Sequence, residues 1–249
     1  MSTNCWVVYN TGIRDLPVSS YHCNNLQSAI KQPDKVTELL DRECSKGYLH
    51  GPFESPPFDV YRINPLGLVE SIYMYSKQFR LIVDLSAPHN SSLHTSINNL
   101  IDKEEYSLSY VRMDDAISVI KEAGRGALMC KTDIVDAFKL IPIKSSLWPY
   151  HGIHWNNKYY FFKHLSFGSR NSPKRFTFLS EAIHYIATTN NNISHLLYLL
   201  HDILSIVPKN EDGVRNMALL THVFGTLSIP IHPDKTFGPD TTMVFLGIS

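Results

Sequence analysis

Two acidic residues far apart in the chain are candidate ligands for divalent metal ions. Asp133 follows the apolar run 127–130 and sits where a buried strand should end. Asp202 lies about 70 residues later, between the apolar runs 195–200 and 203–207, which predict a hairpin with Asp202 in its turn. Carboxylate oxygens are the ligands that Mg²⁺ prefers, and paired carboxylates can hold the two metal ions of a phosphoryl transfer. The plainer alternative is that Asp133 caps the end of a strand.

The composition is that of a globular protein with no overall charge. The chain has 249 residues, 43% hydrophobic and 18% charged, enough for one large domain or two small ones. Lysine plus arginine equals aspartate plus glutamate at 23 each, so no global basic field favours a polyanion partner. The four cysteines have no metal-ligand spacing and read as free thiols in a reducing compartment.

Targeting signals are not apparent. The first residues lack a basic head and an apolar segment, so we expect no signal peptide and an intracellular protein, cytoplasmic or nuclear. The most apolar long run, 193–207, contains His195, His201 and Asp202 and is too short and polar to span a membrane.

Periodicity and turn residues predict an α+β fold, a sheet with helices packed on one face. Residues 1–32 form a lead-in of uncertain order, and 48–57, rich in Gly and Pro, are predicted to be loop. Helices are expected at 34–46, 114–123, 173–187 and 212–227, with a break at 188–192. Strands are expected at 68–75, 78–85, 127–133, 151–155, 158–163, 195–200, 203–207 and 243–248.

Six sequence blocks carry a resemblance to a known family. They are 55–69, FRLIVDLSAPHNSS at 79–92, KTDIVDAFKLIPI at 131–143, HLSFGSRNSPKRFTF at 164–178, HLLYLLHDILSI at 195–206, and HPDKTFGP with VFLGI at 232–248. In this order the chain resembles the reverse transcriptases of DIRS-type tyrosine-recombinase retrotransposons. The resemblance implies a right-hand polymerase with an antiparallel palm sheet, mainly fingers at 33–125 and mainly palm at 126–249, the two interleaved. Because the sequence given stops just after the last block, we expect it to contain no thumb or ribonuclease H.

The resemblance also implies roles for individual residues. Asp133 matches the first metal-binding acid, and Phe138 the aromatic that screens the sugar 2′-position. Lys77 and Arg80 match the fingers cations that hold the triphosphate, and Lys235 matches a palm lysine near the leaving phosphate. The segment that touches template and nucleotide is matched by Phe167, Gly168 and Pro173. The strand at the primer end is matched by Phe245–Gly247.

One block departs from the family. Where the family has an aromatic, any residue and two aspartates, this chain has Leu199, Leu200, His201 and Asp202. Imidazole is a poorer ligand than carboxylate for Mg²⁺, and the change removes a negative charge between two dications. We expect a loss of about 10²-fold or more in rate. Ser166 stands where proline is common in the family.

The sequence therefore supports two functions. The first is an RNA-directed DNA polymerase that uses Mg²⁺ or Mn²⁺ at Asp133 and Asp202, with a template–primer and deoxynucleoside triphosphates as partners. Its activity would be reduced by His201. The second is a catalytically silent relic that binds nucleic acid or a protein.

Several residues keep alternative interpretations. His201 could favour Mn²⁺ or Zn²⁺, or reflect decay of the site. Asp136 fits a helix start beside the site. The basic residues Arg170, Lys174 and Arg175 could line a template track or form a solvated face, and the aromatics 159–162 fit a sheet better than a base-stacking platform.

Overall fold

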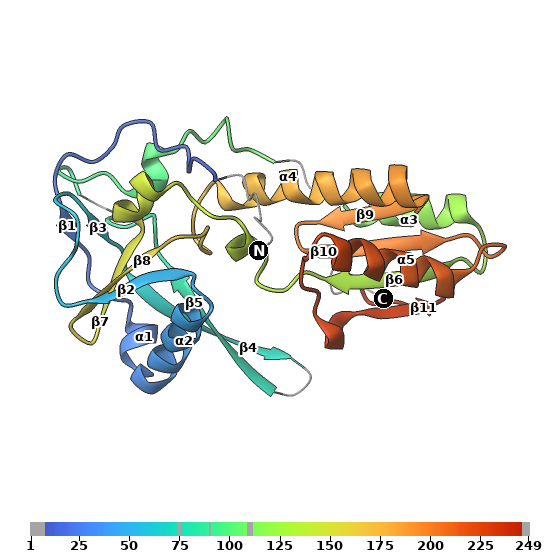
Figure 1. Ribbon diagram of the computed structural model, residues 1–249, viewed down its shortest axis with the longest axis horizontal. Coiled ribbons are helices and arrows are strands. Elements are labelled where there is room, and N and C mark those ends of the chain that lie inside the picture. Colours follow the sequence, from blue (N-terminus) through green and yellow to red (C-terminus); the bar gives the residue numbers. More distant parts are fainter. Residues whose placement is uncertain (1–7, 74–75, 90, 109–111, 246–249) are drawn as a thin grey trace. The chain divides into compact units, whose positions relative to one another are not determined.

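The chain folds into two compact units, which are interleaved in sequence. The computed structural model describes residues 8–73, 76–89, 91–108 and 112–245 (Figure 1). Unit 1 comprises residues 1–107 and 138–172, and unit 2 comprises 108–137 and 173–249. In the described part of the chain, no helix combines the length and hydrophobicity needed to cross a bilayer.

Unit 1 contains a five-stranded sheet in the order β1-β3-β7-β8-β2 and a separate hairpin, β4–β5. Apolar side chains from helix α2, the hairpin and strands β7 and β8 form its main core, which includes Leu40, Leu66 and Ile153. Its elements are β1 (Tyr21–His22), α1 (Gln27–Ile30), α2 (Pro33–Ser45), β2 (Leu49–Phe53), β3 (Arg62–Ile63), β4 (Leu66–Tyr73), β5 (Ser76–Val83), β7 (Gly152–Trp155) and β8 (Lys158–Phe162).

Local chemistry explains why several of these elements form where expected. Helix α2 begins with Pro33, which is preorganised for a first helical turn, and buries Val36, Leu39 and Leu40 on one face. Strands β7 and β8 are joined by Asn156 and Asn157, both at positive φ, as a two-residue hairpin turn requires.

Unit 2 contains a four-stranded antiparallel sheet in the order β11-β6-β10-β9. Asp212 begins its last helix by accepting hydrogen bonds from the amides of Val214 and Arg215 at 2.9 and 3.0 Å. Its elements are α3 (Met113–Ala123), β6 (Leu128–Asp133), α4 (Ser172–Tyr185, in this unit from Pro173), β9 (His195–Leu199), β10 (Asp202–Val207), α5 (Gly213–Thr226) and β11 (Phe237–Asp240).

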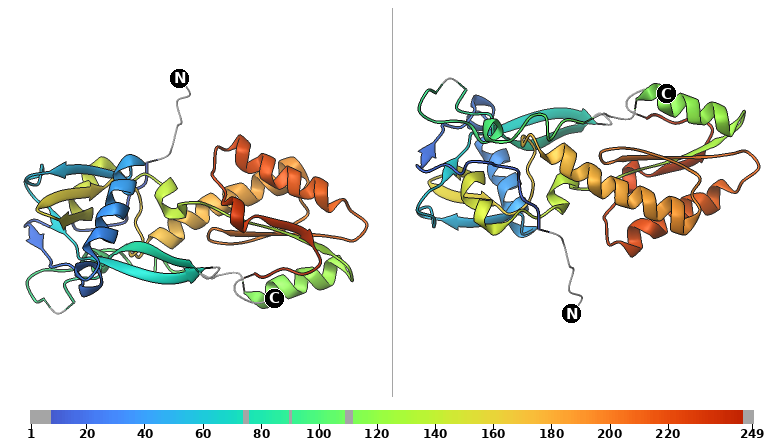
Figure 2. Two further views of the ribbon diagram at one scale, coloured as in Figure 1. Left: turned by 90° about the horizontal axis from the view of Figure 1, so that it is seen from below. Right: turned by 90° about the horizontal axis from the view of Figure 1, so that it is seen from above.

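The expectation that helices pack on one face of the sheet is wrong for unit 2. Cys130 and Ser205, paired across β6 and β10, contact the start of α5 and Asn216, whereas Leu204 and Ile206 pack with Ala116 of α3. Successive strand residues point to opposite faces. Helices α5 and α3 therefore lie on opposite sides of the sheet, as Figure 2 shows.

Three boundaries also differ from the sequence predictions. The expected loop 48–57 contains strand β2, and α4 continues into a π-helical turn, Ile186–Asn190, across the expected break. Strand β11 (Phe237–Asp240) was not predicted, and only the first half of the predicted strand 243–248 lies among the described residues. Residues 243 and 244 are irregular, Phe245 makes only an isolated bridge, and 246–248 lie outside the described residues.

Candidate active site

Strand register brings the two predicted metal ligands together in unit 2. Strands β6 and β10 are antiparallel neighbours, and Asp133, the last residue of β6, stands directly opposite Asp202, the first residue of β10. Burial stabilises the pairing, because Ile203 and Leu204 of β10 and Cys130 of β6 are almost completely buried. Both carboxylates thus lie at the same end of the sheet, as expected from the sequence.

The turn before Asp202 is held by contacts to its backbone. Leu199 pairs with Asp202, so Leu200 and His201 form a two-residue turn, with Leu200 at φ 53°. Positive φ is uncommon for a residue with a branched side chain. The Leu200 carbonyl accepts a 3.0 Å bond from Ser180 Oγ of α4, and the His201 carbonyl accepts one of 3.0 Å from the Ile134 amide. These contacts fix the position of His201 beside the carboxylates.

The three side chains form a cluster able to hold a metal ion. One ligand atom from each of Asp133, His201 and Asp202 lies within 4.8 Å of the others. His201 Nε2 is 3.9 Å from Asp133 Oδ2. The Asp133 side chain is 7% exposed and that of His201 is 35% exposed, so the cluster opens to solvent on the histidine side.

Each carboxylate of the cluster also has a lysine partner. Lys235 Nζ is 3.0 Å from Asp133 Oδ2, and Lys131 Nζ is 3.2 Å from Asp202 Oδ1. Lys131 also donates to the Val244 carbonyl at 3.4 Å and lies over the ring of Phe245. With neutral imidazole, two lysines and two aspartates sum to zero charge, so a divalent ion must compete with both ammonium groups.

Lys131 was not singled out from the sequence, although a signal for it exists. Residues two apart in a strand share a face, so Lys131 and Asp133 point to the same side of β6. A predicted hairpin at 195–207 pairing with this strand would have placed Asp202 within reach of both.

The donor set fits one borderline divalent ion better than two Mg²⁺ ions. Two carboxylates balance one dication, whereas a second dication would add positive charge to a cluster that already contains Lys131 and Lys235. Imidazole commonly binds Mn²⁺ and Zn²⁺ in proteins and rarely binds Mg²⁺.

In unit 1, three predicted substrate-binding residues lie close to one another. The rings of Phe138 and Phe167 pack with centroids 4.9 Å apart at 55°. Gly168 follows at φ +108°, and a Cβ there would overlap the carbonyl oxygen of Val83. Only glycine suits this position, because both the dihedral and the close approach exclude a side chain.

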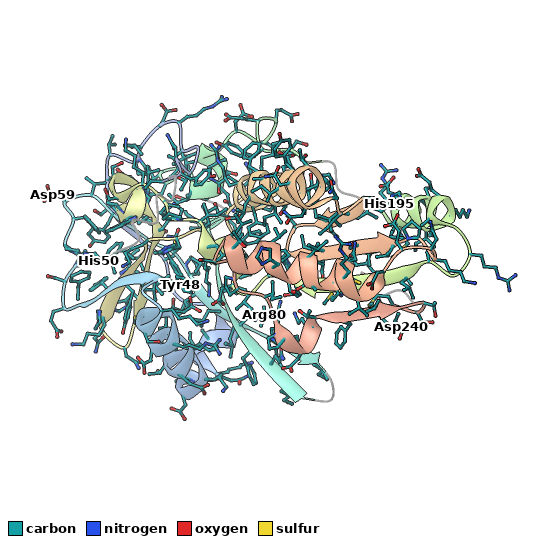
Figure 3. All side chains as sticks on the ribbon, turned by 45° about the vertical axis from the view of Figure 1, so that its right-hand side comes forward. Tyr48, His50, Asp59, Arg80, His195 and Asp240 are labelled. Carbon is teal, nitrogen blue, oxygen red and sulfur yellow. The ribbon has the colours of Figure 1, made fainter. Side chains whose placement is uncertain are left out.

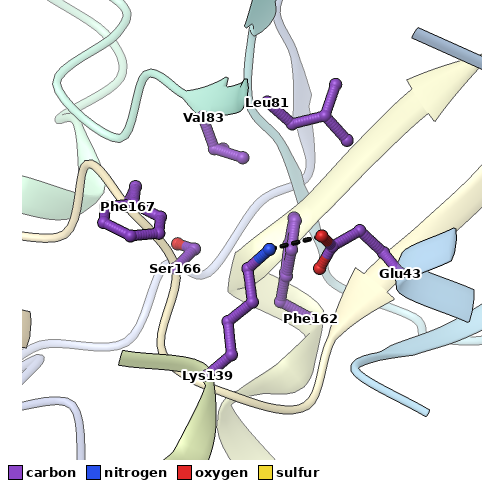
Figure 4. A pocket seen from close by; sticks show the side chains of 7 residues that line it. All are labelled: Glu43, Leu81, Val83, Lys139, Phe162, Ser166 and Phe167. Carbon is purple, nitrogen blue, oxygen red and sulfur yellow. Dashed lines mark hydrogen bonds and ion pairs between the residues drawn. The ribbon is translucent and has the colours of Figure 1, made fainter. Parts of the chain in front are cut away.

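A small cavity lies beside Phe167 in unit 1, and Figure 4 shows its lining. Lys139 pairs there with Glu43, whose side chain is 6% exposed. Glu43 Oε2 and Ser166 Oγ are buried without a hydrogen-bond partner. The cavity has room for about one water molecule and cannot hold a nucleotide.

The two predicted triphosphate-binding cations lie on β5 but do not share a face. Lys77 is opposite Ile72, and Arg80, labelled in Figure 3, is opposite Val69. Because they are three residues apart, their side chains project to opposite sides of the hairpin. Lys77 Nζ forms a 2.8 Å ion pair with Glu70, and the lysine side chain is 67% exposed.

The remaining predicted residues have clear positions. Pro173 is the second residue of α4, and Lys235 ends a 3-10 turn, Pro233–Lys235. Asp136 immediately precedes the 3-10 turn Ala137–Leu140, with φ 54°. Phe245 is buried with α3 side chains, and Leu246 and Gly247 lie outside the described residues.

The basic and aromatic residues also have positions. Arg170 Nη1 donates to the Ile101 carbonyl at 3.2 Å, and Lys174 lies over the ring of Phe178. Tyr159–Phe162 belong to strand β8, with Phe161 and Phe162 buried, as the sheet interpretation predicts. The described cysteines, Cys23, Cys44 and Cys130, are free thiols.

Solved structures resemble this fold over nearly its whole length. The native protease–reverse transcriptase of Prototype Foamy Virus superposes with a TM-score of 0.64 at 16% identity, covering 96% of this chain and 28% of its own. The foamy viral enzyme in complex with double-stranded DNA gives 0.66 at 14% identity, covering 97% and 37%. The same enzyme with an RNA/DNA hybrid gives 0.60 at 14% identity, covering 97% and 30%.

The chain has a reverse-transcriptase-like fold. It spans about a third of the length of these viral proteins. The sequence matches no family model and no curated protein. At this level of identity the similarity concerns the fold, and the resemblance to the DIRS type stays a prediction.

Proposed function

We propose that this chain is the fingers and palm of a DIRS-type reverse transcriptase, an RNA-directed DNA polymerase whose activity His201 reduces. The observation that carries the proposal is the register of β6 and β10, which sets Asp133 opposite Asp202 in an antiparallel sheet. The similarity of fold to reverse transcriptases supports it. Residues 33–125 would be mainly fingers and 126–249 mainly palm, acting in the cytoplasm or nucleus.

Each site residue then has a role. Asp133 and Asp202 would hold a divalent ion, which would supply Lewis-acid activation of the primer 3′-hydroxyl and neutralise negative charge on the phosphates of the deoxynucleotide. Lys235, which pairs with Asp133 in this structure, would exchange that partner to balance charge on the leaving phosphate. Phe138 favours deoxynucleotides over ribonucleotides. Phe167, Gly168 and Pro173 contact template and nucleotide, and Lys77 and Arg80 contact the triphosphate.

Primer extension on a primed RNA template tests the proposal. The unmodified chain, His201→Asp and Asp133→Asn are compared with Mg²⁺ and separately with Mn²⁺. We expect His201→Asp to extend at least about 10²-fold faster with Mg²⁺ than the unmodified chain, because the new carboxylate supplies oxygen and charge. Asp133→Asn is expected to abolish extension. Equal rates for the unmodified chain and His201→Asp would contradict the assigned effect of His201.

A second candidate function is a silent module that binds nucleic acid or a protein. It is favoured by His201 and by the two lysines that neutralise the carboxylates. Template binding by all three proteins without extension by any would support it. Rapid metal-dependent extension by the unmodified chain would exclude it.

A further inference from the structure

Asn98 uses its side chain to connect two segments of unit 1 that are about 70 residues apart. Its Nδ2 donates to Ser86 Oγ at 2.8 Å and to the Gly168 carbonyl at 2.9 Å, while Oδ1 accepts from the Arg170 amide at 2.8 Å. Its own amide donates to the Leu85 carbonyl at 2.9 Å. The residue is 6% exposed, so each of these bonds is shielded from water.

The element that carries Asn98 is itself held in place. It lies in the 3-10 turn Ile97–Leu100, where Ser96 caps the turn through the Asn99 amide and Ile97 is 1% exposed. The next residue, Ile101, accepts the bond from Arg170 Nη1. Segment 96–101 thus binds both backbone and side chain of the 168–170 turn.

The turn it holds has little freedom on its other side. Gly168 lies directly against the Val83 carbonyl at the end of β5. Asn98 completes this contact, because it bonds to Leu85 and Ser86 after β5 and to Gly168 and Arg170. Phe167, immediately before Gly168, packs on Phe138. The orientation of the Phe167 ring therefore depends on the backbone that Asn98 fixes.

We infer that Asn98 is a positioning residue that sets the Phe167–Gly168 segment for contact with nucleotide and template. The inference rests on the proposed function, because that function assigns the segment its substrate. Asn98 need not touch substrate. Removing its amide would leave the Gly168 carbonyl and Arg170 amide without partners and free the turn to leave the end of β5.

A matched control is available in the same unit. Asn64 is also buried, at 2% exposed, and its Nδ2 also donates to two backbone carbonyls, those of Tyr150 and Gly152, at 3.1 Å each. Asn64→Ala removes similar bonds without touching the 168–170 turn. Both variants are made in the His201→Asp background, where we expect measurable extension.

Three measurements test the role of Asn98: hydrogen exchange at residues 166–171, KM and kcat for deoxynucleotide, and template–primer affinity. We expect Asn98→Ala to speed exchange in the turn and raise KM about tenfold, with kcat within about threefold. A loss of about 1.4 kcal/mol in binding corresponds to that factor. Asn64→Ala should lower thermal stability to a similar extent and leave KM unchanged. If Asn98→Ala fails to fold, Asn98→Ser replaces it.

The outcomes separate this inference from the proposed function. If the parent protein extends but Asn98→Ala behaves like Asn64→Ala in KM and affinity, the role of Asn98 is wrong and the polymerase assignment stands. If the parent binds template–primer without extending it, the silent module is favoured, and equal affinities of Asn98→Ala and Asn64→Ala would show that the role of Asn98 is wrong. If the parent neither extends nor binds template–primer, the polymerase assignment fails and the role of Asn98 fails with it.

Discussion

At the scale of single residues, the pairing of Lys131 with Asp202 predicts that the lysine lowers the affinity of the site for a divalent metal ion. Lys131 Nζ lies 3.2 Å from Asp202 Oδ1 and its side chain is only 16% exposed, so water screens the pair weakly. Lys131→Met removes the competing cation. We expect Mn²⁺ affinity, measured by calorimetry, to rise about tenfold, roughly 1.4 kcal/mol.

The control for this substitution is Lys158→Met, which removes a lysine paired with Glu54 at the surface of unit 1. It should leave Mn²⁺ affinity unchanged. If Lys131→Met weakens Mn²⁺ binding instead, the lysine orients Asp202 for the metal and does not compete with it.

Another residue-scale prediction concerns acid stability. Burial lowers the pKa of His151 to about 4 in the folded protein, and the side chain is 2% exposed. His151 is therefore protonated below about pH 6.5 in the unfolded chain, but only below about pH 4 in the folded protein. The free energy of unfolding is therefore unaffected by His151 above pH 6.5 and decreases as the pH falls from 6.5 toward 4.

The loss should amount to about 2 kcal/mol by pH 5. His151→Leu, which cannot be protonated, should make the dependence of unfolding free energy on pH between 6.5 and 4 less steep, as followed by denaturant titration. Part of the slope should remain, because burial also lowers the pKa of His164 to about 4. His195→Leu, at a partly exposed position on β9, serves as control and should leave the dependence unchanged. A slope equally steep in His151→Leu would show that other groups determine acid stability.

At the scale of elements, the contact between Gly168 and the end of β5 should tolerate no side chain. Gly168→Ala adds a Cβ that overlaps the Val83 carbonyl at a φ of +108°. We expect a loss of about 2–4 kcal/mol in unfolding free energy, combining overlap with an unfavourable dihedral. Gly225→Ala is the control, because this exposed residue of α5 has open space around it. That change should stabilise by about 0.5 kcal/mol.

Two of the strands that the sequence did not predict, β2 and β11, share a physical cause. Strand β2 contains Gly51 and Pro52, and β11 contains Gly238 and Pro239, residues that normally interrupt strands. Both are edge strands with an irregular register, where one side has no ladder to maintain. A sequence pattern does not say which strand will be an edge, so these segments read as loops.

Elements defined by local chemistry were predicted well. The Asn156–Asn157 turn, helix α2 and the strands that carry Asp133 and Asp202 follow from residues adjacent in sequence. The face of the sheet that α3 covers cannot be predicted in this way, because the apolar stripe of a helix can pack on either face. The same limit applies to Asn98, whose partners Gly168 and Arg170 are about 70 residues away.

At the scale of the whole molecule, charge balance limits how this chain can bind nucleic acid. Its 23 basic residues are matched by 23 acidic ones, so attraction to phosphates must come from local groups. Among the proposed contacts, Arg170 already donates to the Ile101 carbonyl, and Lys77 pairs with Glu70. Binding should therefore neutralise few phosphates.

Each phosphate neutralised on a single strand contributes about −0.7 to the slope of log affinity against log salt. With about three contacts, we expect a slope near −2 for single-stranded RNA between 25 and 200 mM KCl, measured by fluorescence anisotropy. Lys174→Met should make the slope less negative by about 0.7 if this lysine contacts phosphate, whereas Lys158→Met should not change it. A slope near −6 would require a continuous basic track, which a chain with no net charge would have to assemble by gathering its cations on one surface. A slope near −2 would instead indicate that affinity depends on the fit of a few residues, so that small changes in the 168–170 turn have large effects on binding.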